Sequence, residues 1–171
     1  MLGISTLENS QMTPPGSSQN SLFVKAWFIP TWVILILAKL AIRLIPFKRI
    51  APLLGRSKGT ACSIPLLTRS QTRRAKLVAS VISSAARYVP SDSNCYPEAL
   101  TAVLLLRLYG IPYAFFFGLK RDPSSDSFKA HAWAASGTVR LTGGGGFDEY
   151  TVVGCFICPR LAMELEKKFN A

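Results

Sequence analysis

Acidic residues are almost missing from the first half of the 171-residue chain. Residues 1–91 contain twelve Lys and Arg but only Glu8 as an acid, whereas residues 92–171 contain eight residues of each sign. The net charge of +11 therefore belongs to the N-terminal half. Such a surface attracts an anionic partner, for example an acidic peptide or a lipid headgroup. Nucleic acid is disfavoured, because this half contains no zinc-finger, RNP-type or helix-turn-helix pattern. A solvated basic face is the alternative.

The chain also lacks a secretory signal and a long uninterrupted apolar run. Residues 1–21 are polar, so we expect a disordered tail there and no signal peptide. The most apolar stretch is Leu22 to Pro46, but only 13 uncharged residues separate Lys25 from Lys39. A membrane span needs about 20 apolar residues. We expect a helix from Thr31 to Leu44 that packs on the domain, with a membrane surface or a partner as alternatives. We expect a cytoplasmic protein, with membrane association left open.

Cysteine and histidine are scarce. The chain has cysteines at 62, 95, 155 and 158, and His131 is its single histidine. In a reducing cytoplasm we expect thiols rather than disulfides. Cys155 and Cys158 have the spacing of a zinc or redox pair, but zinc takes four ligands and the chain offers few others. We therefore expect two small buried residues there, and neither a metal nor a cofactor.

Hydrophobic periodicity predicts helices first and strands afterwards. We expect an apolar, basic helical segment and loops over 22–68, and a core over 69–171. Within the first part, Pro52, Gly55, Gly59 and Pro65 predict loops and short turns over 47–68. Helices are predicted at 70–89, at 97–109 with Gly110 as the stop, and at 160–169. Strands are predicted at 112–119, 128–135, 138–142 and 150–156, with a tight turn at Ser136-Gly137. This order implies an α+β fold with an antiparallel sheet.

Cys95 stands at the start of the helix predicted at 97–109. The free N–H groups and the positive dipole end of a helix start favour the thiolate and can bind an oxyanion. A thiol needs a base, and His131 lies in the predicted strand 128–135. A cysteine at a helix start with a histidine on a neighbouring strand is the arrangement of papain-like enzymes. The alternatives are a buried cysteine that fills space and a structural histidine.

Three segments together resemble the transglutaminase-like leader peptidases of lasso-peptide biosynthesis. They are Asn94 to Leu100, Leu105 to Pro112, and Phe128 to Trp133, with Gly118 between the last two. Leu44 to Arg49 is similar to the basic N-terminal segment of that family, and Tyr150 to Phe156 is similar to its aromatic closing strand. The resemblance covers roughly Leu35 to Phe156. It implies a papain/transglutaminase-like core and a cysteine peptidase, with Cys95 as nucleophile, His131 as base and Trp133 close by.

The resemblance also implies partners. These enzymes cut the leader from a ribosomally made lasso precursor peptide, so that a separate ATP-dependent cyclase can close the ring. Some members carry a winged-helix leader-binding module at the front. The front of this chain is short and polar, so we expect that module as a separate protein.

The family often has an aspartate about a dozen residues after the histidine. Here that stretch is Leu141 to Gly144, and the candidate third catalytic residue is Asp148, seventeen residues after His131 and beyond four glycines. Asp148 and Glu149 as surface charges are the alternative. Two other functions therefore stay open: a non-catalytic module that binds the leader or the cyclase, and a basic membrane-surface protein.

Overall fold

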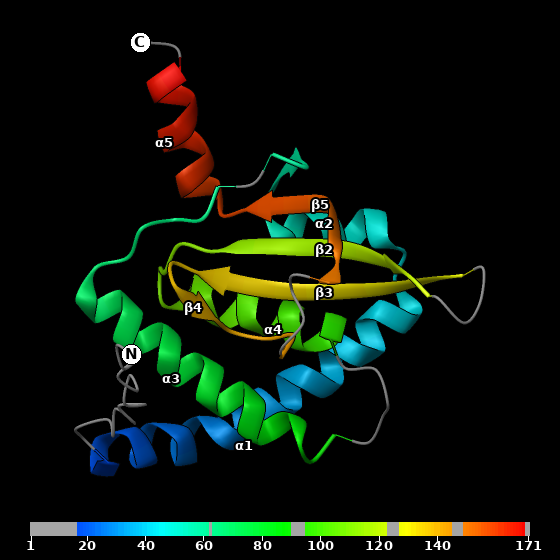
Figure 1. Ribbon diagram of the computed structural model, residues 1–171. Helices are drawn as coiled ribbons and strands as arrows, with labels where there is room; N and C mark the ends of the chain where they lie inside the picture. Colours follow the sequence, from blue (N-terminus) through cyan, green and yellow to red (C-terminus); the bar gives the residue numbers. More distant parts are fainter. Residues whose placement is uncertain (1–16, 62, 90–94, 123–126, 145–148, 170–171) are drawn as a thin grey trace, which may run out of the picture.

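Helix α4 lies on one face of an antiparallel sheet, and α1 and α3 pack against α4 (Figure 1). The computed structural model describes residues 17–61, 63–89, 95–122, 127–144 and 149–169. The helices are α1 (Ser17–Leu44), α2 (Phe47–Leu54), α3 (Arg69–Ala86), α4 (Cys95–Leu108) and α5 (Pro159–Phe169). The strands are β1 (Arg56–Gly59), β2 (Ala114–Arg121), β3 (Phe128–Ser136), β4 (Val139–Arg140) and β5 (Thr151–Ile157). The predicted α+β class and its order of elements are confirmed.

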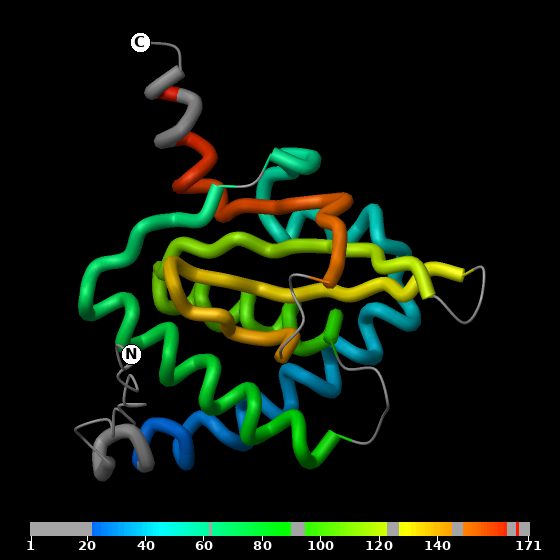
Figure 2. Tube along the Cα trace, in the orientation of Figure 1, coloured from blue at the N-terminus to red at the C-terminus, as the bar shows by residue number. Residues whose placement is uncertain are grey.

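The sheet has the strand order β1-β5-β2-β3-β4, and every neighbouring pair is antiparallel. The trace in Figure 2 shows β2 and β3 as its long central hairpin. Side chains alternate between the two faces of a strand. On β3, Ala132 and Ala134 belong to the core that also contains α4, whereas Trp133 and Ala135 belong to a second cluster on the other face. The two faces of the sheet therefore have separate cores.

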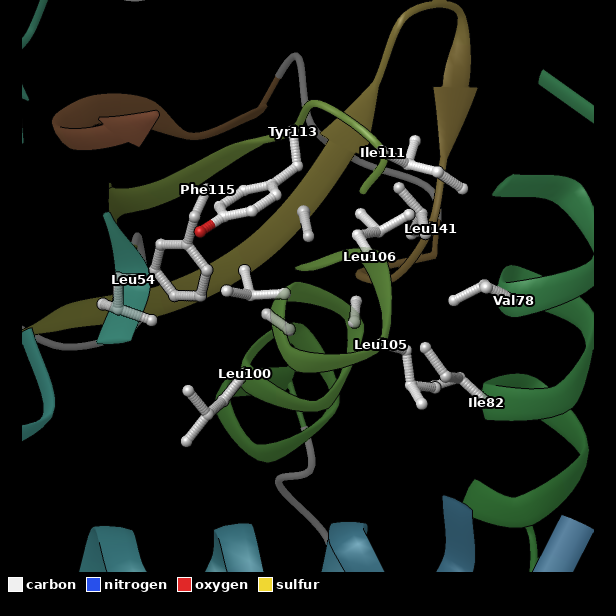
Figure 3. Close-up of a cluster of buried hydrophobic side chains, with 14 of the residues drawn as sticks. Leu54, Val78, Ile82, Leu100, Leu105, Leu106, Ile111, Tyr113, Phe115 and Leu141 are labelled. Carbon is white, nitrogen blue, oxygen red and sulfur yellow. The ribbon is translucent and has the colours of Figure 1, made fainter. Parts of the chain in front are cut away.

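Helix α4 is buried along nearly its whole length. Its buried apolar residues are Ala99, Leu100, Ala102, Val103, Leu105 and Leu106. The helix ends as predicted at Gly110: the amide of Ile111 donates to the Leu106 carbonyl at 2.8 Å, and that of Gly110 donates to Arg107 at 3.0 Å. This is the pattern of a Schellman cap. In Figure 3, side chains of α3, α4 and β2 meet in one core around this helix.

Helix α1 is longer than predicted. It begins at Ser17 rather than near Thr31, and it continues through Pro30. A proline inside a helix removes one hydrogen bond and kinks or breaks the helix in isolation. Here tertiary packing compensates for the lost stability. Trp27 stacks edge-on against Tyr109 at the end of α4, and the indole N–H of Trp32 donates to the Tyr88 carbonyl at 3.3 Å. These contacts hold both sides of Pro30 on the domain.

The segment expected to form loops, residues 47–68, contains a helix and a strand. Ile50 and Leu54 of α2 are buried, and the guanidinium of Arg107 donates to the Leu53 carbonyl at 2.8 Å. Pro52 and the glycines at 55 and 59 suggested loops, but contacts with α4 and with β5 form α2 and β1. The prediction of loops was wrong there because tertiary contacts override local propensity.

The cysteines differ from expectation in one respect. Cys155 and Cys158 are buried, as predicted. Cys155 is disulfide-bonded, while Cys95 and Cys158 are free. Cys62 lies outside the described residues. The expectation of thiols throughout was wrong for Cys155, because that expectation rested on the compartment alone and not on the fold.

The buried phenol of Tyr113 generates a stability prediction. Its hydroxyl has no hydrogen-bond partner among the described residues, and burial raises the pKa of Tyr113 to about 12. Removing an unpartnered hydroxyl without changing the shape of the side chain is nearly neutral or stabilising. We expect Tyr113→Phe to leave the free energy of unfolding in urea unchanged or to raise it by about 1 kcal/mol. The neighbouring Phe115→Ala should lower it by about 3–5 kcal/mol. A clear loss of stability in Tyr113→Phe would contradict this account.

Candidate active site

Cys95 is the first residue of α4, as the sequence predicted. It is free and half-buried. The first-turn N–H groups of a helix have no partner within the helix, so they are available to an anion. Because the remainder of α4 is packed in the core, the start of the helix is held in a fixed position. A thiol there can act as a nucleophile if a base reaches it.

His131 lies on β3 among aromatic rings. Its ring centroid is 5.7 Å from that of Trp133 and 4.9 Å from that of Tyr150. Trp133 therefore lies beside His131, as predicted, and it also stacks on Phe116. Gly118 is the register partner of His131 on β2. A Cβ at Gly118 would lie 2.8 Å from the Trp133 ring and 2.9 Å from Cβ of Tyr150. The aromatic packing around the imidazole thus requires glycine at this position.

The imidazole of His131 is hydrogen-bonded to a backbone carbonyl. Its Nε2 lies 3.1 Å from the carbonyl oxygen of Gly143. A carbonyl only accepts, so Nε2 carries the proton of this bond, and Nδ1 is the basic nitrogen of the neutral ring. Gly143 follows His131 by 12 residues, the spacing at which the resemblance placed an aspartate. A neutral acceptor therefore occupies the position expected for the acid.

Thr142 explains how Gly143 reaches His131. After β4 the chain continues along β3, with the Leu141 amide donating to the Ala134 carbonyl at 2.9 Å. The Ala134 amide in turn donates to Oγ1 of Thr142 at 3.2 Å, and Thr142 is buried. The side chain of Thr142 substitutes for a backbone acceptor at the point where the ladder ends. Sequence reasoning missed Gly143, because a backbone carbonyl has no side-chain signature, and it missed Thr142, because only the path of the chain brings this hydroxyl to the Ala134 amide.

Cys95 and His131 are not hydrogen-bonded to each other within the described part of the chain. Helix α4 packs on the sheet face that carries Ala132 and Ala134, and strand alternation places His131 on the face of Trp133. A cavity of about 550 Å³ is lined by Glu98, one turn after Cys95, and by Gly143, the partner of His131, but not by Cys95 or His131 themselves.

Of the acids considered for the third position, Asp148 lies outside the described residues. Glu149 is exposed, and its carboxylate pairs with Lys120 at 2.5 Å. This hydrogen bond lowers the pKa of Glu149. Glu149 is therefore a surface charge, as one interpretation of the sequence proposed.

A second cavity, of about 650 Å³, lies on the Trp133 side of the sheet. Its lining is mainly apolar and includes Leu66, Phe116 and Trp133, with Arg140 at its edge. Arg140 also lines the cavity that contains Glu98 and Gly143. Trp133, which lines this cavity, also lies beside His131. The described residues contain no group of three His, Cys, Asp or Glu side chains that could hold a metal ion.

The molecule thus has a thiol at the start of a core helix and a tethered histidine on the antiparallel sheet that this helix packs against. This places it with proteins of the α+β class that carry such a pair. A family model, that of the transglutaminase-like superfamily, matches residues 36–155. The match covers more than half of the chain, so the chain belongs to the transglutaminase-like superfamily. No curated protein and no solved structure shows a significant match.

Thr142 provides a test of how the histidine is held. Thr142→Val leaves the buried Ala134 amide without its acceptor, which should cost about 1–3 kcal/mol of unfolding free energy. It should also shift the ring NMR signals of His131, which are unambiguous because the chain has one histidine. Thr142→Ser keeps the hydroxyl and should change both much less. Equal behaviour of the two variants would contradict this role for Oγ1.

Glu98 gives a pH-dependent prediction. Burial raises the pKa of Glu98, so the folded protein binds a proton more tightly there than the unfolded chain does. Stability contributed by this group is then lost as the pH rises from the unfolded pKa to the folded one, and it stays lost above both. We expect Glu98→Gln to be more stable than the parent at pH 7, with the difference vanishing below about pH 4. Glu149→Gln, whose carboxyl has a lowered pKa, should show no gain at pH 7 in the same urea titrations.

Proposed function

We propose that this protein is a cysteine peptidase that removes the leader from a ribosomally made lasso-peptide precursor before macrocyclisation. The observation that carries the proposal is the pairing, inside one transglutaminase-like family match, of a free Cys95 at a helix start with a His131 whose Nε2 is already engaged. The bond to Gly143 leaves Nδ1 as the unprotonated nitrogen of the neutral ring, and general-base catalysis requires an unprotonated nitrogen. The motifs around both residues resemble those of the leader peptidases.

The chemistry follows from these two groups. His131 Nδ1 takes the proton of the Cys95 thiol, and the sulfur attacks the carbonyl carbon of the scissile peptide bond. First-turn N–H groups of α4 hold the oxyanion. The imidazolium then gives its proton to the leaving amine as the C–N bond breaks, and water hydrolyses the thioester in a second, similar cycle. The structure places α4 and His131 on opposite faces of the sheet, so the reaction requires a rearrangement that brings Sγ and Nδ1 within about 3 Å once substrate is bound.

The carbonyl of Gly143 orients the imidazole, but as a neutral group it stabilises the imidazolium less than a carboxylate would. We therefore expect slower turnover than in a site whose histidine is held by a carboxylate. Asp148 is retained as a weaker candidate for the third residue.

We propose that the cavity beside Trp133 binds an apolar side chain of the peptide, and that this contact determines specificity. Its lining of Leu66, Phe116 and Trp133 is apolar, and Arg140 lies where it adjoins the cavity containing Gly143. We propose that the leader reaches the site on a separate winged-helix leader-binding protein, and that an ATP-dependent cyclase takes the released core peptide. Both partners follow from the family resemblance.

A second candidate function is a non-catalytic module that binds the leader or the cyclase. Two observations favour it: no hydrogen bond joins Cys95 and His131 in the described residues, and the third position holds a neutral acceptor.

Leader release separates the two functions. The parent protein is mixed with the precursor peptide and the leader-binding protein, and products are followed by mass spectrometry. Cys95→Ala and His131→Ala should each lower the cleavage rate by at least about a thousandfold, since one lacks the nucleophile and the other its proton acceptor. Asp148→Asn should lower it less than either.

The matched control is Cys158→Ala, which removes the second cysteine that is free among the described residues and should cleave at close to the parent rate. If Cys95→Ala cleaves as fast as the parent, the peptidase proposal fails. If the parent binds the leader, measured by fluorescence anisotropy, and cleaves nothing, the chain is the binding module instead.

A further inference from the structure

Helix α1 presents an unbroken apolar stripe to solvent. The buried residues of this helix, Thr31, Leu35 and Ala38, face α3 and α4. On the opposite side of the helix lie exposed apolar residues with spacings of about three or four positions: Leu22, Ala26, Ile29, Val33, Ile36, Leu37, Leu40 and Leu44. Leu22 and Leu44 are 67% and 70% exposed. At about 1.5 Å per residue the stripe is about 33 Å long, far more than scattered surface leucines would give.

Basic residues border this stripe, and α1 contains no acidic residue. Lys25 and Arg43 are exposed and stand five full turns apart, so they share one line along the helix, next to the apolar stripe. Lys48 and Arg49, exposed on α2, continue the positive charge just beyond the end of α1. In all of residues 1–91 the only acid is Glu8. An apolar stripe edged by cations fits a surface that is apolar inside and anionic at its rim.

We propose that α1 docks the protein on an anionic lipid surface, lying in the plane of the interface with the apolar stripe among the acyl chains. Helices of this kind bury their apolar face about 5–10 Å into the headgroup boundary, and each Lys or Arg near an anionic surface adds to the attraction. This inference is independent of the peptidase reaction.

Two other occupants fit the structure less well. Helix α1 is long and apolar enough to cross a membrane, but crossing would pull Leu35 and Ala38 out of the core and expose the residues beneath them. A second copy of the chain would bring two strongly basic surfaces together, because a two-fold interface pairs a patch with itself. Like charges facing each other oppose that contact.

Vesicle co-sedimentation of the full chain tests the proposal. We expect binding to phosphatidylcholine vesicles containing 30% phosphatidylglycerol, and at least tenfold weaker binding to pure phosphatidylcholine. Leu37→Glu, in the middle of the stripe, should weaken binding to the anionic vesicles at least tenfold. The double variant Lys25→Gln with Arg43→Gln should weaken binding to the anionic vesicles by about five- to thirtyfold. Raising the salt concentration should reduce this difference between the double variant and the parent.

The matched control is Val153→Glu, which adds the same charge at an exposed apolar residue of β5 and should bind nearly as the parent does. All variants change exposed residues, and circular dichroism checks that they fold. If Leu37→Glu does not fold, the Lys25 and Arg43 double variant still decides.

Four results would overturn the proposal. Equal binding by the parent and either stripe variant removes the role of α1. Equal binding to both vesicle types would show that the charge of the lipid does not contribute to binding. Resistance to extraction at high pH assigns a span instead of interfacial docking. A dimer that Leu37→Glu abolishes in analytical ultracentrifugation, without lipid binding, assigns the stripe to a second copy.

Discussion

The burial of α4 is the constraint on which the rest of the molecule depends. A helix that is apolar on nearly all sides cannot lie on a surface, so it must be covered all round. The sheet covers it through Phe115, Ala132 and Ala134, while α1 and α3 cover it from the other side. Both ends of the helix reach the surface: Arg107 and Leu108 are exposed at its C-terminal end, and Cys95 stands half-buried at its N-terminal end. The same packing that stabilises the fold therefore also fixes the nucleophile.

The histidine is positioned by a different kind of interaction. Its ring is enclosed by Trp133 and Tyr150, and its Nε2 is held by the carbonyl of Gly143. Gly143 is in turn aligned by the hydrogen bond between Thr142 and Ala134. A side-chain carboxylate would supply both orientation and charge, whereas this carbonyl supplies orientation alone. The chain that follows β4 at the edge of the sheet therefore positions His131, and no acidic group among the described residues does so.

Much of the fold could be predicted from the sequence, because α3, α4 and the four later strands have strong periodicity and clear stops such as Gly110. The start of α1 was missed because Pro30 ends a helix by local rules, and aromatic contacts with α4 decide otherwise. Pro52 likewise indicated a loop, so α2 was missed. In the site, Cys95, His131 and Trp133 carry side-chain signals and could be named. Gly143 could not, since any residue type offers a carbonyl and only the path of the chain brings this one to the histidine.

Gly118 shows how tightly the histidine's surroundings are matched. The space that a methyl group would need there is filled by the ring of Trp133 and by Cβ of Tyr150. Three chain positions from three different strands or strand ends therefore share one fixed volume. A larger residue at 118 requires a smaller one at 133 or a moved backbone at 150, and each of these changes would alter a ring that touches His131. Substitutions at positions 118, 133 and 150 are thus coupled: these residues must change together or remain as they are.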